Sequence, residues 1–245
     1  MTYSIKNVET GADIYASQTS TILLGAPSNP EALELAVAAM TKGSHVEVRT
    51  TGEYLFSAAE NGTLGVQAST KVLLDITVHE FNKARSRYDM SFEEKVALAG
   101  ELKEHGNALF KAGQTRRAVQ KYQGVLDMFS SIASLSDDEK VKAHAIVLPC
   151  HLNQAAALIK TRDFRKAIEQ ADKALAIEPG NAKATYRKAQ SLNSLAEFEK
   201  AKALLTVAIE ASPDNADFKA LLANVNKSIK AQNEKDASVF KRMFA

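Results

Sequence analysis

Hydrophobic and polar residues alternate in the N-terminal third of the chain. Two stretches, His45–Thr50 and Val72–Val78, show the period of two that is typical of half-buried strands. A third short stretch, Ser20–Leu24, is also strand-like. Between Ser20–Leu24 and His45–Thr50, Pro30–Met40 carries apolar residues at helical spacing after an Asn-Pro start signal. The pattern predicts a small α+β unit of several strands and one helix.

From Ser91 onward the pattern indicates helix after helix with short turns between them. This part is rich in Ala, Leu, Lys and Glu, and it repeats with a period of 34 residues that aligns Pro179 with Pro213. Small residues recur in register, as close packing of paired helices requires. The aligned pairs are Ala155 and Ala189, Leu158 and Leu192, Ala167 and Ala201, and Ala174 and Ala208.

An earlier copy of the repeat begins at Ala99, and a long final helix follows the last copy. The repeats are expected at about 99–132, 148–181 and 182–215, and the final helix at about 215–243. The period and pattern resemble the tetratricopeptide repeat (TPR). This resemblance implies an all-α superhelix with a concave groove and a C-terminal capping helix. We place this TPR domain at 84–245, after an N-terminal domain at 1–83.

Polar residues recur on the first helix of each repeat, which in a TPR array lines the groove. Lys103 and Asn107 are four residues apart, as are Lys183 and Arg187, so each pair shares one helical face. Asn153 lies on the first helix of the second repeat. Three cations and two amides suit a chain-terminal carboxylate together with a neighbouring acidic side chain.

The five polar positions resemble the two-carboxylate clamp of co-chaperone TPR domains, which bind the C-terminal Glu-Glu-Val-Asp of heat-shock proteins 90 and 70. The resemblance implies a peptide-binding set of Lys103, Asn107, Asn153, Lys183 and Arg187. A lone lysine on a repeat helix is usually only a solvated charge, but five matches at defined repeat positions favour the clamp. The clamp leaves the two chaperones undistinguished, because both tails end in the same four residues.

The N-terminal domain resembles the FK506-binding-protein (FKBP-type) prolyl isomerases. Glu31–Gly43 is similar to that family's helix and following turn, Gly52–Ser57 to its loop, and Thr70–Val78 to its final strand. An FKBP-type domain followed by three TPRs is the arrangement of the large immunophilins. The resemblance implies an incomplete α+β FKBP-like domain that lacks roughly the first strand.

The aromatic and acidic pocket positions of that family carry other residues in this chain. The pocket-floor tryptophan corresponds to Leu33, and the chain has no Trp at all. The degenerate isomerase pocket comprises Ile14, Tyr15, Leu33, Phe56 and Leu74. Because rotation of a prolyl bond against its high barrier needs a dry, shaped pocket, we expect little or no isomerase activity and assign no catalytic residue.

Composition narrows the class of protein further. The chain is 45% hydrophobic and 24% charged with a net charge of +2, which indicates a globular protein and argues against a nucleic-acid binder. One cysteine, Cys150, excludes a disulfide framework and a zinc site of several thiolates. We expect no cofactor and no metal. The absence of a secretory signal and of a run of ~20 apolar residues favours the cytoplasm, with shuttling to the nucleus left open.

The sequence therefore predicts a co-chaperone that binds the C-terminal tail of heat-shock protein 90, with the FKBP-like domain contacting a client or partner protein. Three alternatives stay open. They are a heat-shock protein 70 tail binder, an active peptidyl-prolyl cis-trans isomerase, and a scaffold whose groove binds an unrelated acidic C-terminus. No nucleic-acid or membrane partner is expected.

Overall fold

The computed structural model describes residues 1–22, 24, 29–56, 58–82 and 89–243 of the chain. These residues form two compact units. The first consists of Met1–Lys95 with Glu104–Ala118, and the second of Val96–Lys103 with Val119–Ala245. We call residues 1–82, within the first unit, the sheet domain. The domain boundary expected after residue 83 lies outside the described residues.

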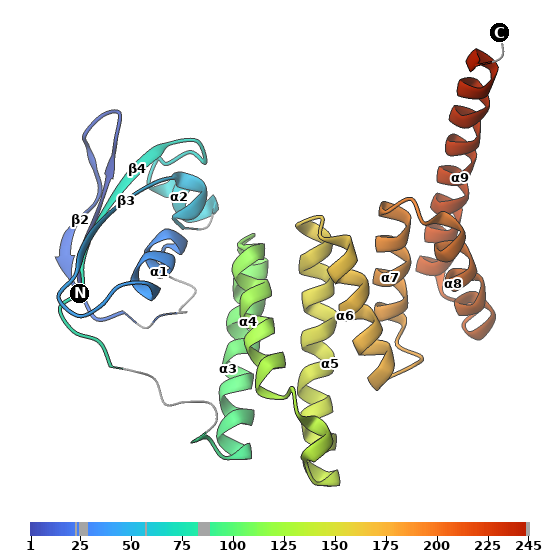
Figure 1. Ribbon diagram of the computed structural model, residues 1–245, viewed down its shortest axis with the longest axis horizontal. Helices are drawn as coiled ribbons and strands as arrows, with labels where there is room; N and C mark the ends of the chain where they lie inside the picture. Colours follow the sequence, from blue (N-terminus) through green and yellow to red (C-terminus); the bar gives the residue numbers. More distant parts are fainter. Residues whose placement is uncertain (23, 25–28, 57, 83–88, 244–245) are drawn as a thin grey trace. The chain divides into compact units, whose positions relative to one another are not determined.

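A four-stranded antiparallel sheet with the order β2-β1-β4-β3 forms the sheet domain. Helix α1 lies on one face of this sheet (Figure 1). The 3-10 turn η1 and the short helix α2 lie between β3 and β4 in the chain. The elements are β1 (Thr2–Asn7), β2 (Asp13–Thr19), α1 (Glu31–Ala38), β3 (His45–Thr51), η1 (Gly52–Tyr54), α2 (Ala58–Thr63) and β4 (Lys71–Thr77).

The core of the sheet domain lies between the sheet and α1. Val72, Leu74 and Ile76 alternate along β4 and are fully buried, which is the period of two that the sequence predicted. Ile5 from β1 and Leu33 from α1 complete the centre of this cluster. β4 pairs with β1 on one side and with β3 on the other, and its buried apolar residues pack in one cluster with α1.

The strand predicted at Ser20–Leu24 is wrong. β2 ends at Thr19, which pairs with Thr2, and the Ser20 amide then donates to the Met1 carbonyl at 2.9 Å. Because β1 itself begins at Thr2, the β1–β2 ladder ends there. Sequence reasoning also missed β1, whose buried residues are consecutive (3–5) rather than alternating. Residue 23 lies outside the described residues.

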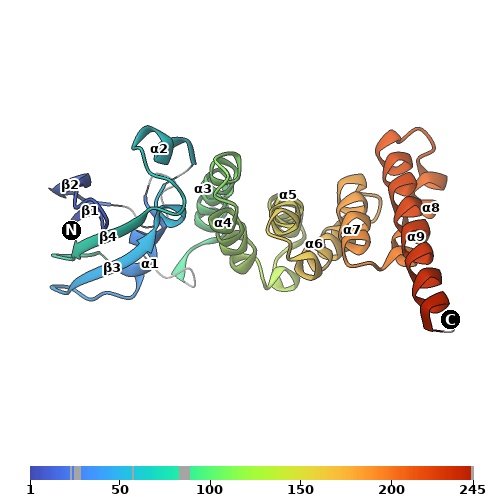
Figure 2. The same ribbon diagram turned by 90° about the horizontal axis from the view of Figure 1, so that it is seen from above.

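The rest of the described chain is helical, and the expected fold class is confirmed. In the second unit, α5 and α6 form one antiparallel hairpin, α7 and α8 another, and α9 packs on α7 and α8 (Figures 1 and 2). The elements are α3 (Phe92–Lys111), α4 (Thr115–Met128), η3 (Ile132–Ser134), α5 (Asp137–Lys160), α6 (Phe164–Ile177), α7 (Ala182–Ser194), α8 (Phe198–Ala211) and α9 (Ala216–Met243). Among the described helices, none is both long enough and apolar enough to cross a membrane.

Alanines at the repeat positions let these helices pack closely. Ala155, Ala167, Ala174, Ala189 and Ala201 have no exposed surface. A larger side chain at any of these positions would push two helices apart, because protein interiors leave few voids. The small residues that define the 34-residue period are therefore the residues of the helix–helix contacts.

The turn inside each helical hairpin has the same backbone geometry. Gly113, Arg162 and Ala196 follow α3, α5 and α7 and have φ values of 81°, 61° and 60°. In each case the next amide donates to a carbonyl five residues earlier, as in a Schellman motif; the pairs are Gln114 to Leu109, Asp163 to Leu158, and Glu197 to Leu192. Two of the three turns therefore hold a non-glycine residue in the left-handed region.

We predict that Gly52→Ala destabilises the sheet domain by about 1–3 kcal/mol. A Cβ atom at this position would lie 2.1 Å from the backbone oxygen of Gln67 and 2.6 Å from Cγ1 of Val66. A backbone oxygen cannot move aside by a change of rotamer. Chemical denaturation, followed by hydrogen exchange of the β4 amides, measures the loss. Gly62→Ala is the matched control, because a Cβ on that helical glycine meets nothing within 4 Å. Equal stability of the two variants would contradict the prediction.

Candidate functional site

Helix α3 carries the first two residues of the predicted clamp. Ser91 caps this helix: its hydroxyl accepts a hydrogen bond from the Glu94 amide, and the Glu94 carboxylate accepts one from the Ser91 amide. Lys103 and Asn107 follow one turn apart, both partly buried. Asn107 Nδ2 donates to Glu104 Oε2 at 3.4 Å. The structure thus places this pair on one helical face, as the spacing predicted.

Asn153, Lys183 and Arg187 lie on helices that contact each other within the second unit. Asn153 is partly buried on α5, which packs directly against α7. Lys183 is exposed in the first turn of α7, behind the N-cap residue Asn181, whose Oδ1 accepts the Ala184 amide at 2.9 Å. A cation in a first turn is opposed by the helix dipole. The position of Lys183 is therefore one that helix stability alone does not favour.

Arg187 is half-buried and incompletely bonded. Its Nη1 atom is shielded from solvent and has no hydrogen-bond partner in the described part of the chain. Burial lowers the pKa of the guanidinium and the nearby Tyr122 raises it, but an arginine stays charged in proteins. An unpaired buried donor costs about 1–3 kcal/mol. The N–H groups of Arg187 are thus suited to a carboxylate ligand that would offset this cost.

His151 ties α5 to α6 two residues before Asn153. Its Nδ1 donates to Gln170 Oε1 at 2.8 Å, and the imidazole is mostly buried. Burial lowers the pKa of His151, and Lys173 lowers it further, whereas the bond to Gln170 raises it. The balance keeps this imidazole neutral in the folded protein at neutral pH.

The five positions of the predicted isomerase pocket all lie against the core of the sheet domain. Leu33 and Leu74 are fully buried, while Ile14, Tyr15 and Phe56 pack on the same cluster from its edge. The Tyr15 ring stacks on Tyr3 with 5.0 Å between ring centres. Burial raises the pKa of Tyr3, and its hydrogen bond with Tyr15 raises it further. The structure therefore brings these five residues together as packing residues.

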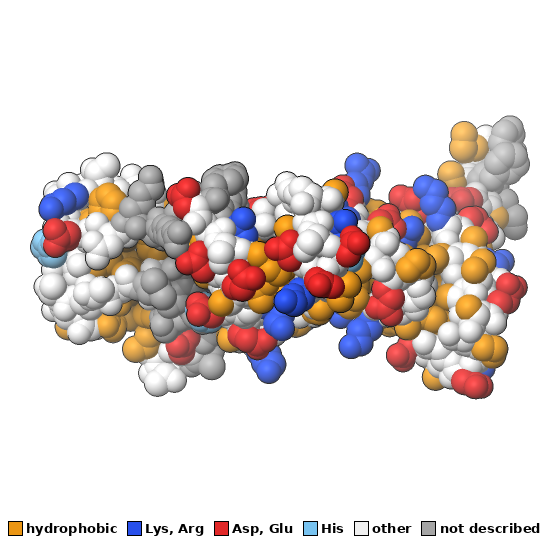
Figure 3. All heavy atoms as spheres, turned by 90° about the horizontal axis from the view of Figure 1, so that it is seen from below, with side chains coloured by type: hydrophobic (Ala, Val, Ile, Leu, Met, Phe, Trp, Pro, Cys, Tyr) orange, Lys and Arg blue, Asp and Glu red, His pale blue; other side chains and the backbone are white. Residues whose placement is uncertain are grey.

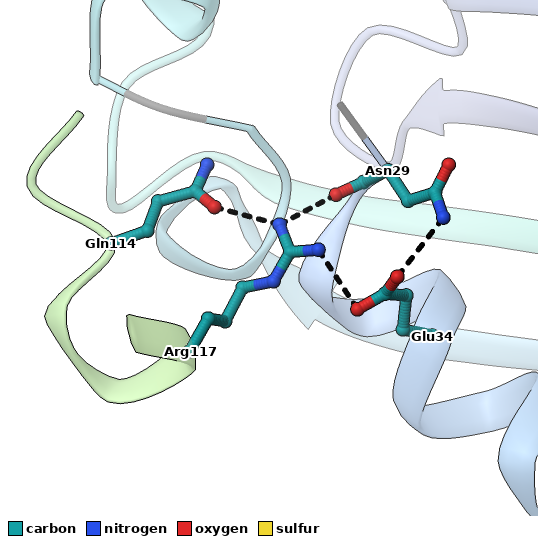
Figure 4. A network of polar contacts seen from close by, with 4 residues as sticks. All are labelled: Asn29, Glu34, Gln114 and Arg117. Carbon is teal, nitrogen blue, oxygen red and sulfur yellow. Dashed lines mark hydrogen bonds and ion pairs between the residues drawn. The ribbon is translucent and has the colours of Figure 1, made fainter. Parts of the chain in front are cut away.

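Sequence reasoning missed Arg117, which is buried and bonds to Asn29 and Glu34 (Figure 4). A signal lay in the repeats themselves. The aligned residues of the later repeats, Lys166 and Lys200, are exposed and pair with an acid three residues earlier. In the first repeat that acid is replaced by Gln114.

Acidic and basic side chains are interspersed on the face of the molecule that Figure 3 shows, with hydrophobic side chains between them. This mixture agrees with the small net charge of the chain. The described residues contain no group of three or more His, Cys, Asp and Glu side chains that could hold a metal ion.

Comparison with known proteins links most of the chain to one architecture. The tetratricopeptide repeat family matches residues 158–225. Peptidyl-prolyl cis-trans isomerase FKBP4 of Bos taurus is 31% identical over 215 residues, which cover 88% of this chain and 47% of that protein. Human FKBP4 is 28% identical over the same extent. The chain thus spans about half the length of the curated relatives it matches.

Two solved structures resemble the chain with TM-scores above 0.5. The C-terminal TPR-containing domain of a Plasmodium falciparum FK506-binding protein has a TM-score of 0.56 and 33% identity, and the match covers 61% of this chain and 99% of that one. The Hsp90 co-chaperone Cns1 of Saccharomyces cerevisiae has a TM-score of 0.52 and 26% identity, with 64% of this chain and 47% of that one covered.

We predict that stability falls as the pH drops below about 6.5, the ordinary pKa of histidine, in part because of His151. Its folded pKa is lowered, so the unfolded state binds more protons in this range and the free energy of unfolding decreases toward acid. The stability contributed by the neutral form of His151 is fully present above pH 6.5. It is lost as the pH falls through the lower pKa that His151 has in the folded state. Thermal unfolding between pH 7.5 and 5 should show a shallower decline for His151→Gln, which keeps a donor for Gln170. Parallel curves for the two proteins would contradict the assignment.

Proposed function

Because the chain belongs to the FKBP-type immunophilins that carry a TPR domain, we propose that it is a co-chaperone whose TPR array binds the C-terminal Glu-Glu-Val-Asp tail of heat-shock protein 90. The relationship to FKBP4 extends over 88% of the chain and so includes both the sheet domain and the repeats. Cns1, which shares the fold, is an Hsp90 co-chaperone. The similarity to Cns1 supports heat-shock protein 90 as the partner of this chain.

The observation that carries the proposal is the buried Nη1 atom of Arg187, which has no hydrogen-bond partner in the described residues. A buried N–H without an acceptor is rare in folded proteins, and Nη1 of Arg187 is one in the described residues. A peptide carboxylate is the acceptor that best matches a guanidinium, because the pair can form two parallel, charge-assisted bonds. We assign Arg187 to an acidic side chain or terminal carboxylate of the tail.

The other four residues supply complementary contacts in this proposal. Lys183 and Lys103 contribute charge, and Lys183 stands where the helix dipole opposes it. Asn107 and Asn153 contribute amide donors for a carboxylate and acceptors for a backbone amide. Three cations facing a doubly charged peptide end also attract the peptide at long range.

Heat-shock protein 70 is the competing partner, because its tail ends in the same four residues. In this proposal the five clamp residues contact only those four residues. Discrimination between the two chaperones must therefore arise from the peptide positions before them. Titration with longer peptides from each chaperone distinguishes the two.

We predict micromolar binding of a Met-Glu-Glu-Val-Asp peptide as the free acid and at least tenfold weaker binding of its C-terminal amide. Removing one charge-paired partner costs about 2–5 kcal/mol, so Lys103→Ala and Arg187→Ala should each nearly abolish binding. Isothermal titration calorimetry measures all of these affinities.

Lys202→Ala is the matched control for the loss of one positive charge, because Lys202 is exposed on α8 rather than on a first helix of a repeat. It should leave the affinity unchanged. Binding should also weaken with added salt, because the Debye length is already only about 8 Å at physiological ionic strength. Full affinity in both Lys103→Ala and Arg187→Ala would refute the clamp.

We further infer that the sheet domain does not catalyse prolyl isomerisation, although FKBP4 bears the name of such an enzyme. Leu33 and Leu74, at two of the pocket positions, are fully buried in the domain's own core. Ile14, Tyr15 and Phe56 pack on that core. Side chains that fill a core leave no room among them for a substrate proline.

The expected rate in a protease-coupled prolyl isomerisation assay is that of the uncatalysed reaction. An active FKBP-type isomerase, assayed with and without its macrolide inhibitor, serves as the positive control. Catalysis by this chain that the inhibitor suppresses would overturn the inference.

A further inference from the structure

The start of α4 is bonded to α1 and the segment before it through Arg117. Its Nη1 donates to the backbone oxygen of Asn29 at 2.7 Å and to Gln114 Oε1 at 2.6 Å, and its Nη2 donates to Glu34 Oε2 at 2.8 Å (Figure 4). The side chain of Arg117 is 2% exposed and that of Glu34 is 17% exposed. All of these residues belong to the first compact unit.

Both oxygens of Glu34 are engaged in this network. Oε2 accepts from Arg117, and Oε1 accepts from Asn29 Nδ2 at 2.9 Å. Asn29 thus contributes its carbonyl to Arg117 and its amide to Glu34 (Figure 4). In the sequence, Arg117 is 83 positions from Glu34 and 88 positions from Asn29. Removing either charge from this packed contact would leave the other without its partner at a largely buried site, which is strongly unfavourable.

A second contact, made by Arg116, lies next to the buried Arg117 contact and is exposed to solvent. Arg116 lies over the Tyr54 ring at 5.6 Å, donates to the Tyr54 hydroxyl at 3.2 Å and pairs with Glu53 at 3.4 Å. More than half of the Arg116 and Glu53 side chains is exposed, so this pair contributes little stability. Two adjacent arginines therefore reach the same part of the sheet domain with very different burial.

The repeats show that Arg117 is adapted to this contact. At the aligned positions Lys166 and Lys200 are exposed and form ion pairs with Asp163 and Glu197, three residues earlier. The first repeat has neutral Gln114 in place of that acid. The positive charge of Arg117 is thereby balanced by Glu34 of the sheet domain instead of by its own turn.

The terminal repeats of a stacked array lack a neighbour on one side and require a cap. At the C-terminal end α9 fills this role, burying Phe218, Leu221 and Val225 against α7 and α8. We propose that the sheet domain caps the α3–α4 turn of the first repeat and that Arg117 is the positioning residue that fastens it to this turn. Its function is then to hold the hairpin whose first helix carries Lys103 and Asn107.

Hydrogen exchange of the full chain tests the cap directly. Arg117→Met keeps the length of the side chain and removes its charge and donors. It should lower the protection of amides in residues 104–118 and 29–38 by on the order of 100-fold and leave α7 to α9 unchanged. Arg116→Met, the neighbouring control, should change neither region by more than a few fold. Unchanged protection of 104–118, or an equal loss throughout the chain, would overturn the proposal.

Glu34→Gln alone tests the contact if Arg117→Met does not fold, and the double variant is added if it does. Glu34→Gln keeps the shape and an acceptor but removes the negative charge, so it should cause a smaller loss confined to the same amides. In the double variant the combined loss should be less than the sum of the two, because both changes remove one interaction. Additive losses would show that Arg117 and Glu34 act independently and would refute the network.

Peptide titration adds a functional readout, and this part rests on the proposed clamp. Arg117→Met should weaken binding of the Met-Glu-Glu-Val-Asp free acid although it leaves all five clamp residues in place. Arg116→Met should bind like the unmodified protein. If the unmodified protein binds no peptide, the clamp fails and hydrogen exchange still decides on the cap. If it binds and Arg117→Met binds equally well, the hairpin does not need the cap.

Discussion

A positive charge taken out of water is the constraint on which the first compact unit depends. Arg117 is tolerated in its buried position only because a carboxylate, a backbone carbonyl and a side-chain amide surround it in fixed directions. Gln114 lies one turn from Arg117, whereas Glu34 and Asn29 lie 83 and 88 residues before it in the sequence. The two segments of the unit therefore depend on each other, because each completes the electrostatic environment of the other.

In the repeats, the packing of the helices determines which helical faces stay available to a ligand. On α7, Ala184, Ala189 and Leu192 are buried in the helix contacts. Lys183, directly before Ala184, is exposed, and Arg187, two residues before Ala189, is only partly buried. The small residues that allow the hairpins to stack thus also decide which side chains remain for a ligand. Stability and binding are divided between neighbouring positions of one helix.

The sequence predicted the repeats better than it predicted the sheet domain, and the reason is the range of the interactions. The 34-residue period and the two helical pairs of clamp positions depend on neighbours three or four residues apart, which a sequence displays directly. The strand expected at Ser20–Leu24 failed because the extent of a strand is set by its distant partner, here β1. The burial of Arg117 depends on Asn29 and Glu34, and only the change from acid to Gln114 in the first repeat hinted at it. The incomplete bonding of Arg187, by contrast, has no sequence signal.

The hairpin turns have a consequence for how such an array can grow. Their left-handed residue is a glycine in one copy and an arginine or alanine in the others, while the amide-to-carbonyl bond across the turn is the same each time. The turn is thus specified by main-chain bonding, and its left-handed position accepts glycine, arginine and alanine. Duplication of one 34-residue copy between α6 and α7 would reproduce its own turn and its own alanine contacts. Modules of this kind can lengthen a protein by whole units while the fastened end and the terminal helix stay as they are.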